Sequence, residues 1–237
     1  YEYPLRVVPS MNAFQIKAEC AAKALEDAGF EWKDVDGVFD VVGGGAGGMR
    51  WVEYLGFKPN ILDTTSTGGS SPEYGASHAL KAIIDGRCSV ALVTHGGTPH
   101  SDRVAIGTAG GTGGGEPNLF GNMEDPWGMT LISNYAMVKT RHMYQYGTTM
   151  EQFAALSVVT RRHAMRNPES VRTMTDLQFE DIREITVEDV LESRMVAHPL
   201  HLLECCLISD GGGAFVIANK EMARNSKRKP NPSTRYH

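Results

Sequence analysis

The sequence predicts an α/β fold in which helices cover a mostly parallel sheet, with a helical subdomain inserted before the last strand. Two observations predict this fold. Short apolar strands alternate with amphipathic helices up to residue 93. A mostly helical stretch then separates these strands from another apolar strand at residues 213–218. With 237 residues, the chain is long enough to bury a core of its own.

The first part of the chain supplies most of the layered core. Ser10 is expected to cap a helix that runs to about Ala28, because apolar residues recur on one face and Gly29 follows as a stop. The glycine-rich residues 43–48 form a loop whose spacing is not that of a nucleotide-binding motif. Strands are expected at residues 37–42, 61–63 and 90–93, with a helical turn at 51–56.

A turn that opens onto a helix organises this core. Residues 63–75 read Asp-Thr-Thr-Ser-Thr-Gly-Gly-Ser-Ser-Pro-Glu-Tyr-Gly, and apolar residues follow at helical spacing up to Ile84. Ser70 or Ser71 suits the N-cap, and Glu73 is placed for a capping box with Ser70. Backbone N–H groups and the helix dipole at such a turn favour an anion or a developing oxyanion. A turn of this composition is, however, more often purely structural.

The remainder is mostly helical. Residues 94–97 are expected to leave the third strand, and residues 101–116 form a long loop rich in glycine and threonine. Pro168 is expected to end a helix, and glycines 211–213 are expected to bend the last strand. Helices are expected at about 131–146, 150–167 and 186–191, a polar surface excursion at 173–183 and a strand at 207–218. The expected divisions are an α/β core at 1–100, a helical lid at 101–203, a return strand at 204–220 and a tail or stub at 221–237.

Composition indicates an intracellular, cytoplasmic protein. No run of residues is apolar for long enough to cross a membrane, and the first residues lack an apolar signal core. The net charge of −5 argues against nucleic acid as the main partner. The four cysteines include an adjacent pair, Cys205 and Cys206, and their spacing suits neither a disulfide framework nor a zinc site. No metal is therefore expected in this chain.

Several segments together resemble the thiolase superfamily in their order and spacing. They are residues 67–93, 125–129 (Asp-Pro-Trp-Gly-Met), 146–149 (Tyr-Gly-Thr-Thr), 161–164 (Arg-Arg-His-Ala), 185–190 (Ile-Thr-Val-Glu-Asp-Val) and 205–214 (Cys-Cys-Leu-Ile-Ser-Asp-Gly-Gly-Gly-Ala). The best-matching branch is that of the sterol-carrier-protein-type and lipid-transfer-protein-type thiolases. The resemblance implies a thiolase-like layered fold around a five-stranded, mostly parallel sheet. It covers the first half of the usual double fold and its loop domain; the usual first strand and the second half are outside it.

The resemblance places the family's nucleophilic cysteine at Gly69, where this chain has no thiol. Without a nucleophile no acyl-enzyme can form there. Retro-aldol cleavage of a β-hydroxyacyl-CoA needs none, since a base removes the hydroxyl proton and hydrogen-bond donors hold the thioester enolate. The resemblance therefore implies a carbon–carbon lyase acting on an acyl-CoA, like the branch's steroid side-chain aldolases. The alternatives are an acyl-CoA acyltransferase that uses another thiol and a non-catalytic thiolase-like subunit.

Three candidate site residues lie in the core. Gly69 and Ser70 would supply backbone donors to the thioester oxygen, unless the turn is purely structural. His95 could carry a proton near neutral pH, although a structural histidine is the commoner case after a core strand. The general base itself would come from the family's second half.

Four further candidates lie in the helical lid. Met129 and Tyr135 would line the acyl-CoA channel, with a role in the core equally well supported. Arg161 and Arg162 could reach a CoA phosphate, although paired arginines on a helix usually form a solvated face. The resemblance also implies a homodimer and a small partner protein of the DUF35 family, with a zinc ribbon and an OB-fold.

Overall fold

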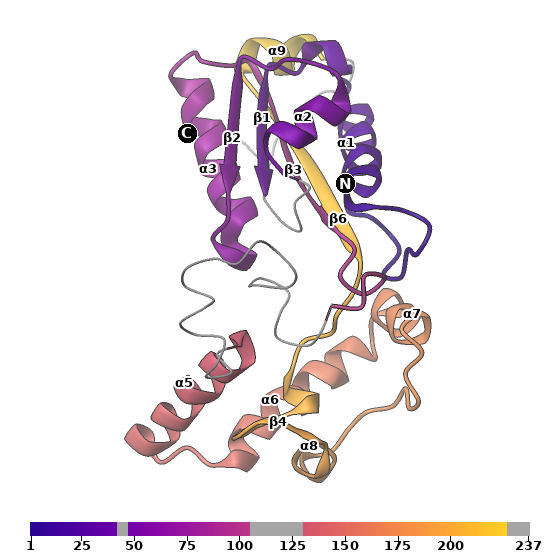
Figure 1. The fold of residues 1–237 in the computed structure, drawn as a ribbon, viewed down its shortest axis with the longest axis vertical. Coiled ribbons are helices and arrows are strands. Elements are labelled where there is room, and N and C mark those ends of the chain that lie inside the picture. Colours follow the sequence, from indigo (N-terminus) through magenta and orange to yellow (C-terminus); the bar gives the residue numbers. More distant parts are fainter. Residues whose placement is uncertain (42–46, 105–129, 227–237) are drawn as a thin grey trace. The chain divides into compact units, whose positions relative to one another are not determined.

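The computed structural model describes residues 1–41, 47–104 and 130–226. The chain divides into two compact units, which are described one at a time (Figure 1). The first holds Tyr1–Thr98 and the segment from Asp210 onwards, and the second holds Pro99–Ser209. Most of the expected loops at 43–48 and 101–116, the segment 125–129 and residues 227–237 of the expected tail lie outside the described residues.

The first unit is built on a sheet in the order β2-β1-β3-β6. Its strands are β1 (Gly37–Val41), β2 (Ile61–Thr65), β3 (Val90–Gly97) and β6 (Gly211–Ala218). β1 pairs in parallel with β2 and β3, whereas β6 pairs antiparallel with β3. Glu2 adds an antiparallel bridge to Gly213, where Tyr3 N donates to Gly212 O at 2.9 Å. The mostly parallel α/β sheet is confirmed, but the described residues give it four strands rather than the expected five, with an isolated bridge from Glu2 to the outer side of β6.

Helices cover both faces of this sheet (Figure 1). α1 (Ala13–Ala28) and α2 (Met49–Leu55) pack on one face around the buried side chains of Ile16, Leu25 and Trp51. α3 (Ser71–Ile84) packs on the other face through Ala79 and Ala82. The short helices η1 (Trp32–Asp34) and η2 (Gly68–Ser70) precede β1 and α3, and α9 (Lys220–Asn225) follows β6.

The start of α1 differs from the prediction. Asn12, not Ser10, caps the helix: its side chain accepts from Gln15 N at 3.0 Å, and Gln15 Oε1 accepts from Asn12 N at 2.8 Å. This reciprocal pair satisfies two backbone donors that a serine two residues earlier could not reach. Gly29 ends the helix at a left-handed φ of 76°, as predicted.

Two predictions around β3 and β6 are wrong. Residues 94–97 do not leave the strand but continue β3, because β6 pairs with it as far as Gly97 opposite Gly211. Residues 211–213 are likewise part of β6 rather than a bend. Each segment takes its extended form from the other, and the two are more than a hundred residues apart in the sequence.

The second unit is mainly helical. Its elements are α5 (Leu131–Tyr146), α6 (Met150–Ala164), α7 (Pro168–Asp176), α8 (Val187–Glu192), η4 (Leu202–Glu204) and the small antiparallel pair β4 (Met195–Ala197) and β5 (Leu200–His201). Gly147 ends α5, and Thr149 caps α6. α6 ends before Pro168, which instead occupies the first turn of α7, where proline is tolerated. α7 therefore takes in the start of the stretch that was predicted to be a polar excursion.

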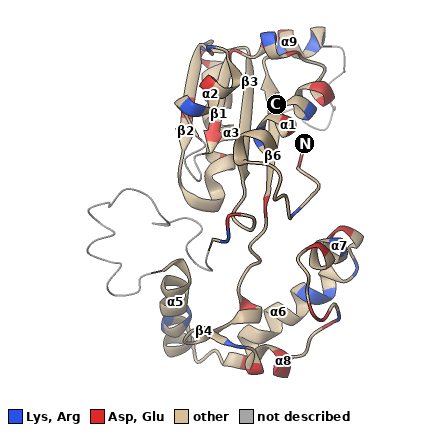
Figure 2. Cartoon of the chain, turned by 45° about the vertical axis from the view of Figure 1, so that its right-hand side comes forward, with Lys and Arg blue, Asp and Glu red and all other residues tan. Residues whose placement is uncertain are grey.

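Charges of both signs are mixed on this unit (Figure 2). Arg183 pairs with Asp189 at 2.8 Å on its surface, and Lys139 pairs with Glu204 in its interior. Across the described parts of the chain, the helices are too short or too polar to span a membrane.

Candidate functional site

The turn between β2 and α3 is held by hydroxyl groups. Thr65 Oγ1 donates to Ser71 O at 3.0 Å, and Thr67 N donates to Ser71 Oγ at 2.8 Å. Ser70 Oγ donates to Thr67 O at 3.2 Å. The predicted capping box with Glu73 is therefore wrong, because the Ser70 hydroxyl bonds back to the turn and gives the helix no cap. The sequence-based prediction did not include the contact between Thr67 and Ser71. The spacing of two hydroxyl residues four positions apart is the sequence signal that could have indicated it.

Gly69 lies in this turn with open space around it. A Cβ atom added to Gly69 would meet no atom of the described residues within 4 Å, and its backbone lies outside the left-handed region. By contrast, Gly68 has a φ of 75°, which favours glycine. Neither backbone strain nor packing requires a glycine at position 69. Position 69 lies beside the first N–H groups of η2 and α3, which have no carbonyl partner within the helix.

His95 lies in the second half of β3. Side chains two residues apart in a strand share a face, so His95 lies on the same face as Val93, which packs towards α3. A Cβ atom on Gly75 of α3 would stand 3.3 Å from Val93 Cγ1, which shows how closely the two elements approach. Because β2 and β3 both run parallel to β1, their carboxyl ends lie at the same end of the sheet. His95, near the end of β3, and η2, which follows β2, therefore lie at that end.

The surroundings of His95 favour its neutral form. One side of the imidazole is open to solvent. The protein atoms crowded on the other side lower its pKa, Lys17 lowers it further, and Asp40 partly opposes them. A neutral imidazole that faces solvent at the sheet edge can accept a proton near neutral pH.

The remaining candidates belong to the second unit. Tyr135 lies on α5 with an exposed ring. Arg161 Nη1 donates to Arg183 O at 3.3 Å, and Arg162 Nε lies 3.7 Å from Glu184 Oε2. Both arginines thus have protein partners near the surface, and their contact with a CoA phosphate stays a prediction. Met129 lies outside the described residues.

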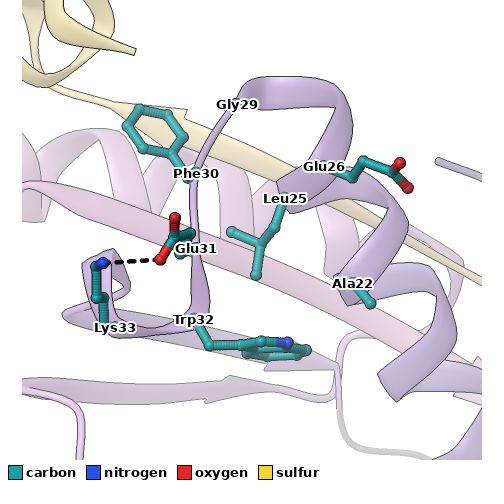
Figure 3. Close-up of a pocket in the computed structure, with 8 residues that line it drawn as sticks. All are labelled: Ala22, Leu25, Glu26, Gly29, Phe30, Glu31, Trp32 and Lys33. Atoms are coloured by element: carbon teal, nitrogen blue, oxygen red, sulfur yellow. Dashed lines mark ion pairs between the residues drawn. The ribbon is translucent and has the colours of Figure 1, made fainter. Parts of the chain in front are cut away.

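A hollow of about 580 Å³ lies at the other end of the sheet (Figure 3). It is bounded by the end of α1 and by η1, which precede the first residue of β1. Its lining is largely apolar, and Lys33 is paired with Glu31 at 2.7 Å. The lining residues are Ala22, Leu25, Glu26, Gly29, Phe30, Glu31, Trp32 and Lys33. This hollow is therefore separate from the carboxyl ends of the strands, where Gly69 and His95 lie.

Comparisons with known proteins identify the family. No family model matches the chain. It is 32% identical to an acetyl-CoA acetyltransferase of Methanothermobacter thermautotrophicus, over 87% of this chain and 52% of that protein. It is 30% identical to a steroid side-chain-cleaving aldolase of Thermomonospora curvata, over 92% of this chain and 55% of that protein. The chain belongs to the thiolase superfamily, in its sterol-carrier-protein-type branch.

A solved structure agrees with this assignment. The Ltp2-ChsH2(DUF35) aldolase matches 94% of this chain and 55% of its own, with a TM-score of 0.72 and 27% sequence identity. The predicted thiolase-like fold is thereby confirmed. This thiolase-type chain spans about half the length of the curated relatives it matches. Those relatives include both lyases and acyltransferases, which act on acyl-CoA thioesters.

Proposed function

We propose that this thiolase-type protein is a carbon–carbon lyase that cleaves a β-hydroxyacyl-CoA by a retro-aldol reaction. The observation that carries the proposal is the glycine at position 69, where the resemblance places the family's nucleophile. Among the described residues, the space around Gly69 leaves room for a cysteine side chain. A glycine that the fold does not require fits a site that has lost the covalent step and gained room for a branched carbon.

In the proposed reaction, a base takes the proton of the β-hydroxyl group. The bond between the α- and β-carbons breaks, which releases a ketone or aldehyde and leaves the electron pair as a thioester enolate. Backbone N–H groups of Gly69 and Ser70 would donate to the enolate oxygen. Protonation of the α-carbon then gives the shortened acyl-CoA. His95 would carry a proton in this cycle, whereas the general base is expected in the family's second half.

An acyltransferase is the second candidate, because a relative of that class is similar to the chain to the same degree as the aldolase. It would need a thiol other than one at position 69. Cys20 and Cys88 are buried, and burial raises the pKa of both. A non-catalytic subunit that supports a partner is the third candidate.

The proposal extends to the assembly. The Ltp2-ChsH2 structure contains a DUF35 protein, and we propose a DUF35-type partner for this protein as well. We also propose a homodimer, with β2 as the available edge of the sheet. All four cysteines are free, which fits the proposed cytoplasmic location.

The test uses the full-length protein, with and without a DUF35-type partner. A β-hydroxyacyl-CoA with a bulky branched β-carbon serves as substrate, and the released ketone is measured before and after treatment with a thiol-blocking reagent. Cleavage that survives the reagent supports the lyase. Inactivation, together with acyl transfer between CoA thioesters, supports the acyltransferase. Binding of acyl-CoA without either reaction supports the non-catalytic subunit.

A further inference from the structure

A buried ion pair joins α1 to β1. Lys17 Nζ donates to Asp40 Oδ1 at 2.8 Å and to Asp40 Oδ2 at 3.0 Å, and both side chains have no exposed surface. Lys17 Nζ also lies 3.4 Å from Val41 O, at the end of β1. Burial lowers the pKa of Lys17, while Asp40 acts in the opposite direction and favours the charged ammonium.

Asp40 extends the connection to two further segments. Thr94 Oγ1 of β3 donates to Asp40 Oδ1 at 2.7 Å. Gly48 N, just before α2, donates to Asp40 Oδ2 at 3.1 Å. The Asp40 carboxylate therefore connects β1 to α1, to β3 and to the residue before α2, near the carboxyl ends of the strands. Thr94 is the residue immediately before His95.

Two glycines let Lys17 reach this position. A Cβ atom on Gly96 would stand 2.8 Å from Lys17 Cγ and 3.3 Å from Ala13 O, so α1 lies directly on β3 at this point. A Cβ atom on Gly212, which pairs with Gly96 across the sheet, would stand 2.8 Å from Ile16 Cγ2. The stem of Lys17 thus crosses β3 at the residue that follows His95.

The ion pair and the glycines therefore act on the two residues that flank His95 in the sequence. Thr94 is fixed by a hydrogen bond to Asp40, and Gly96 is fixed by contact with Lys17. Both lie on the α1 face of the sheet, because they alternate with His95 along the strand. His95 itself is left on the α3 face. Its neighbours in β3 are held from the α1 face, while the His95 side chain itself is exposed.

We propose that Lys17, Asp40 and Thr94 position His95. The buried Lys17–Asp40 ion pair fixes the carboxyl-terminal part of β3 through its hydrogen bond with the Thr94 hydroxyl. This inference rests on the proposed function where it gives His95 a role in proton transfer. None of the three side chains touches the reacting atoms in this account. They are positioning residues that set where the imidazole stands.

The energetics support a positioning role over one in stability alone. A buried ion pair loses the solvation of both charges, and replacing it with apolar residues is often neutral or stabilising. Apolar side chains would, however, leave Thr94 Oγ1 and Gly48 N without their acceptor. The carboxylate supplies directed hydrogen bonds to two segments at once, which a close-packed apolar cluster does not.

The test compares Thr94→Val with Thr94→Ser in the full-length protein. Valine keeps the shape of threonine but removes the hydroxyl, whereas serine keeps the hydroxyl and removes the methyl group. One readout is the position of the His95 imidazole resonance in a ¹H–¹³C NMR spectrum, assigned by its loss in His95→Gln. His78 of α3, whose Nδ1 lies 2.6 Å from Oδ2 of Asp63 in β2, serves as an internal reference. The other readout is the separate effect on kcat and KM.

We expect the His95 resonance to shift in Thr94→Val and to stay at its wild-type position in Thr94→Ser, with His78 unchanged in both. We also expect kcat to fall about tenfold in Thr94→Val with KM nearly unchanged, since a small misplacement of a reacting group acts on the chemical step. An unshifted His95 resonance in folded Thr94→Val would overturn the inference, as would equal effects of the two variants. If the wild-type protein cleaves no β-hydroxyacyl-CoA, the proposed function fails, and the NMR comparison still decides the inference.

Discussion

A Cβ atom on Gly212 would stand 2.7 Å from the carbonyl oxygen of His95. The strand that carries His95 is thus packed against β6 and α1 without room for a methyl group. By contrast, a Cβ atom on Gly69 would meet none of the atoms in the described part of the chain within 4 Å. The two glycines therefore have different reasons to be glycine: close packing at position 212 and an open site at position 69.

Gly212→Ala should lower the free energy of unfolding by about 1–3 kcal/mol, because the added methyl group forces β3, β6 and α1 apart. Gly69→Ala is the matched control and should change it by less than about 0.5 kcal/mol. Urea unfolding of both variants measures the difference. Equal stabilities for the two variants would contradict the packing described here.

Lys17→Met should lower the free energy of unfolding by about 3–5 kcal/mol, because it leaves the Asp40 carboxylate buried without its cation. The double variant Lys17→Met with Asp40→Asn should recover a large part of this loss, since an amide oxygen still accepts from Thr94 without carrying a charge. Unfolding curves for the single and double variants supply the comparison. A double variant less stable than the single one would show that the pair is not coupled in this way.

Gly69→Cys should fold like the wild type and gain the ability to take an acyl group from acetyl-CoA. The thiol would stand within η2, two residues before α3, whose N-terminus favours the thiolate. Intact mass spectrometry detects the added acetyl group, and Gly69→Ser provides a control without a thiol. A folded Gly69→Cys protein that never carries the acetyl group would argue against position 69 as the family's nucleophile position.

The stability of the protein should depend on pH through His95. Its surroundings lower the pKa from 6.5 in the folded state, so at mildly acidic pH the unfolded chain binds a proton that the folded chain does not. The contribution of His95 is then complete above about pH 6.5 and is lost as the pH falls towards the folded-state pKa. The wild type should therefore lose stability relative to His95→Gln as the pH falls below about 6.5 towards the folded-state pKa. A difference that does not vary with pH would contradict this.

The cysteines should differ in their reaction with iodoacetamide. Cys206 is exposed and should be labelled first. Cys20 has no exposed surface, and burial raises its pKa to about 11, so it should react only after unfolding. Peptide mapping after timed labelling gives the order. Modification of Cys206 should leave the proposed cleavage activity intact.

Local patterns predicted the elements whose ends are fixed by their own residues. The stop of α1 was predictable because Gly29, the residue at the helix end, takes the left-handed conformation itself. The extension of β3 to Gly97 could not be predicted in this way, because it depends on pairing with a distant strand.

The site shows the same division between local and distant signals. The turn at Gly69 is visible in the sequence as a glycine pair before a helix. The Lys17–Asp40 pair is not, because its two residues come from a helix and a strand that meet only in the folded sheet. Lys17 reads in the sequence as one more charged residue on an amphipathic helix, and only its complete burial in the structure shows that it faces the core.

The central claim is that this protein cleaves a carbon–carbon bond without a covalent acyl intermediate. Intact mass spectrometry of the full-length protein during turnover of a β-hydroxyacyl-CoA, with parallel detection of the ketone, tests this claim most directly. We predict release of the ketone with no mass added to the protein. An acyl group attached to a cysteine of the wild-type protein during turnover would contradict the account.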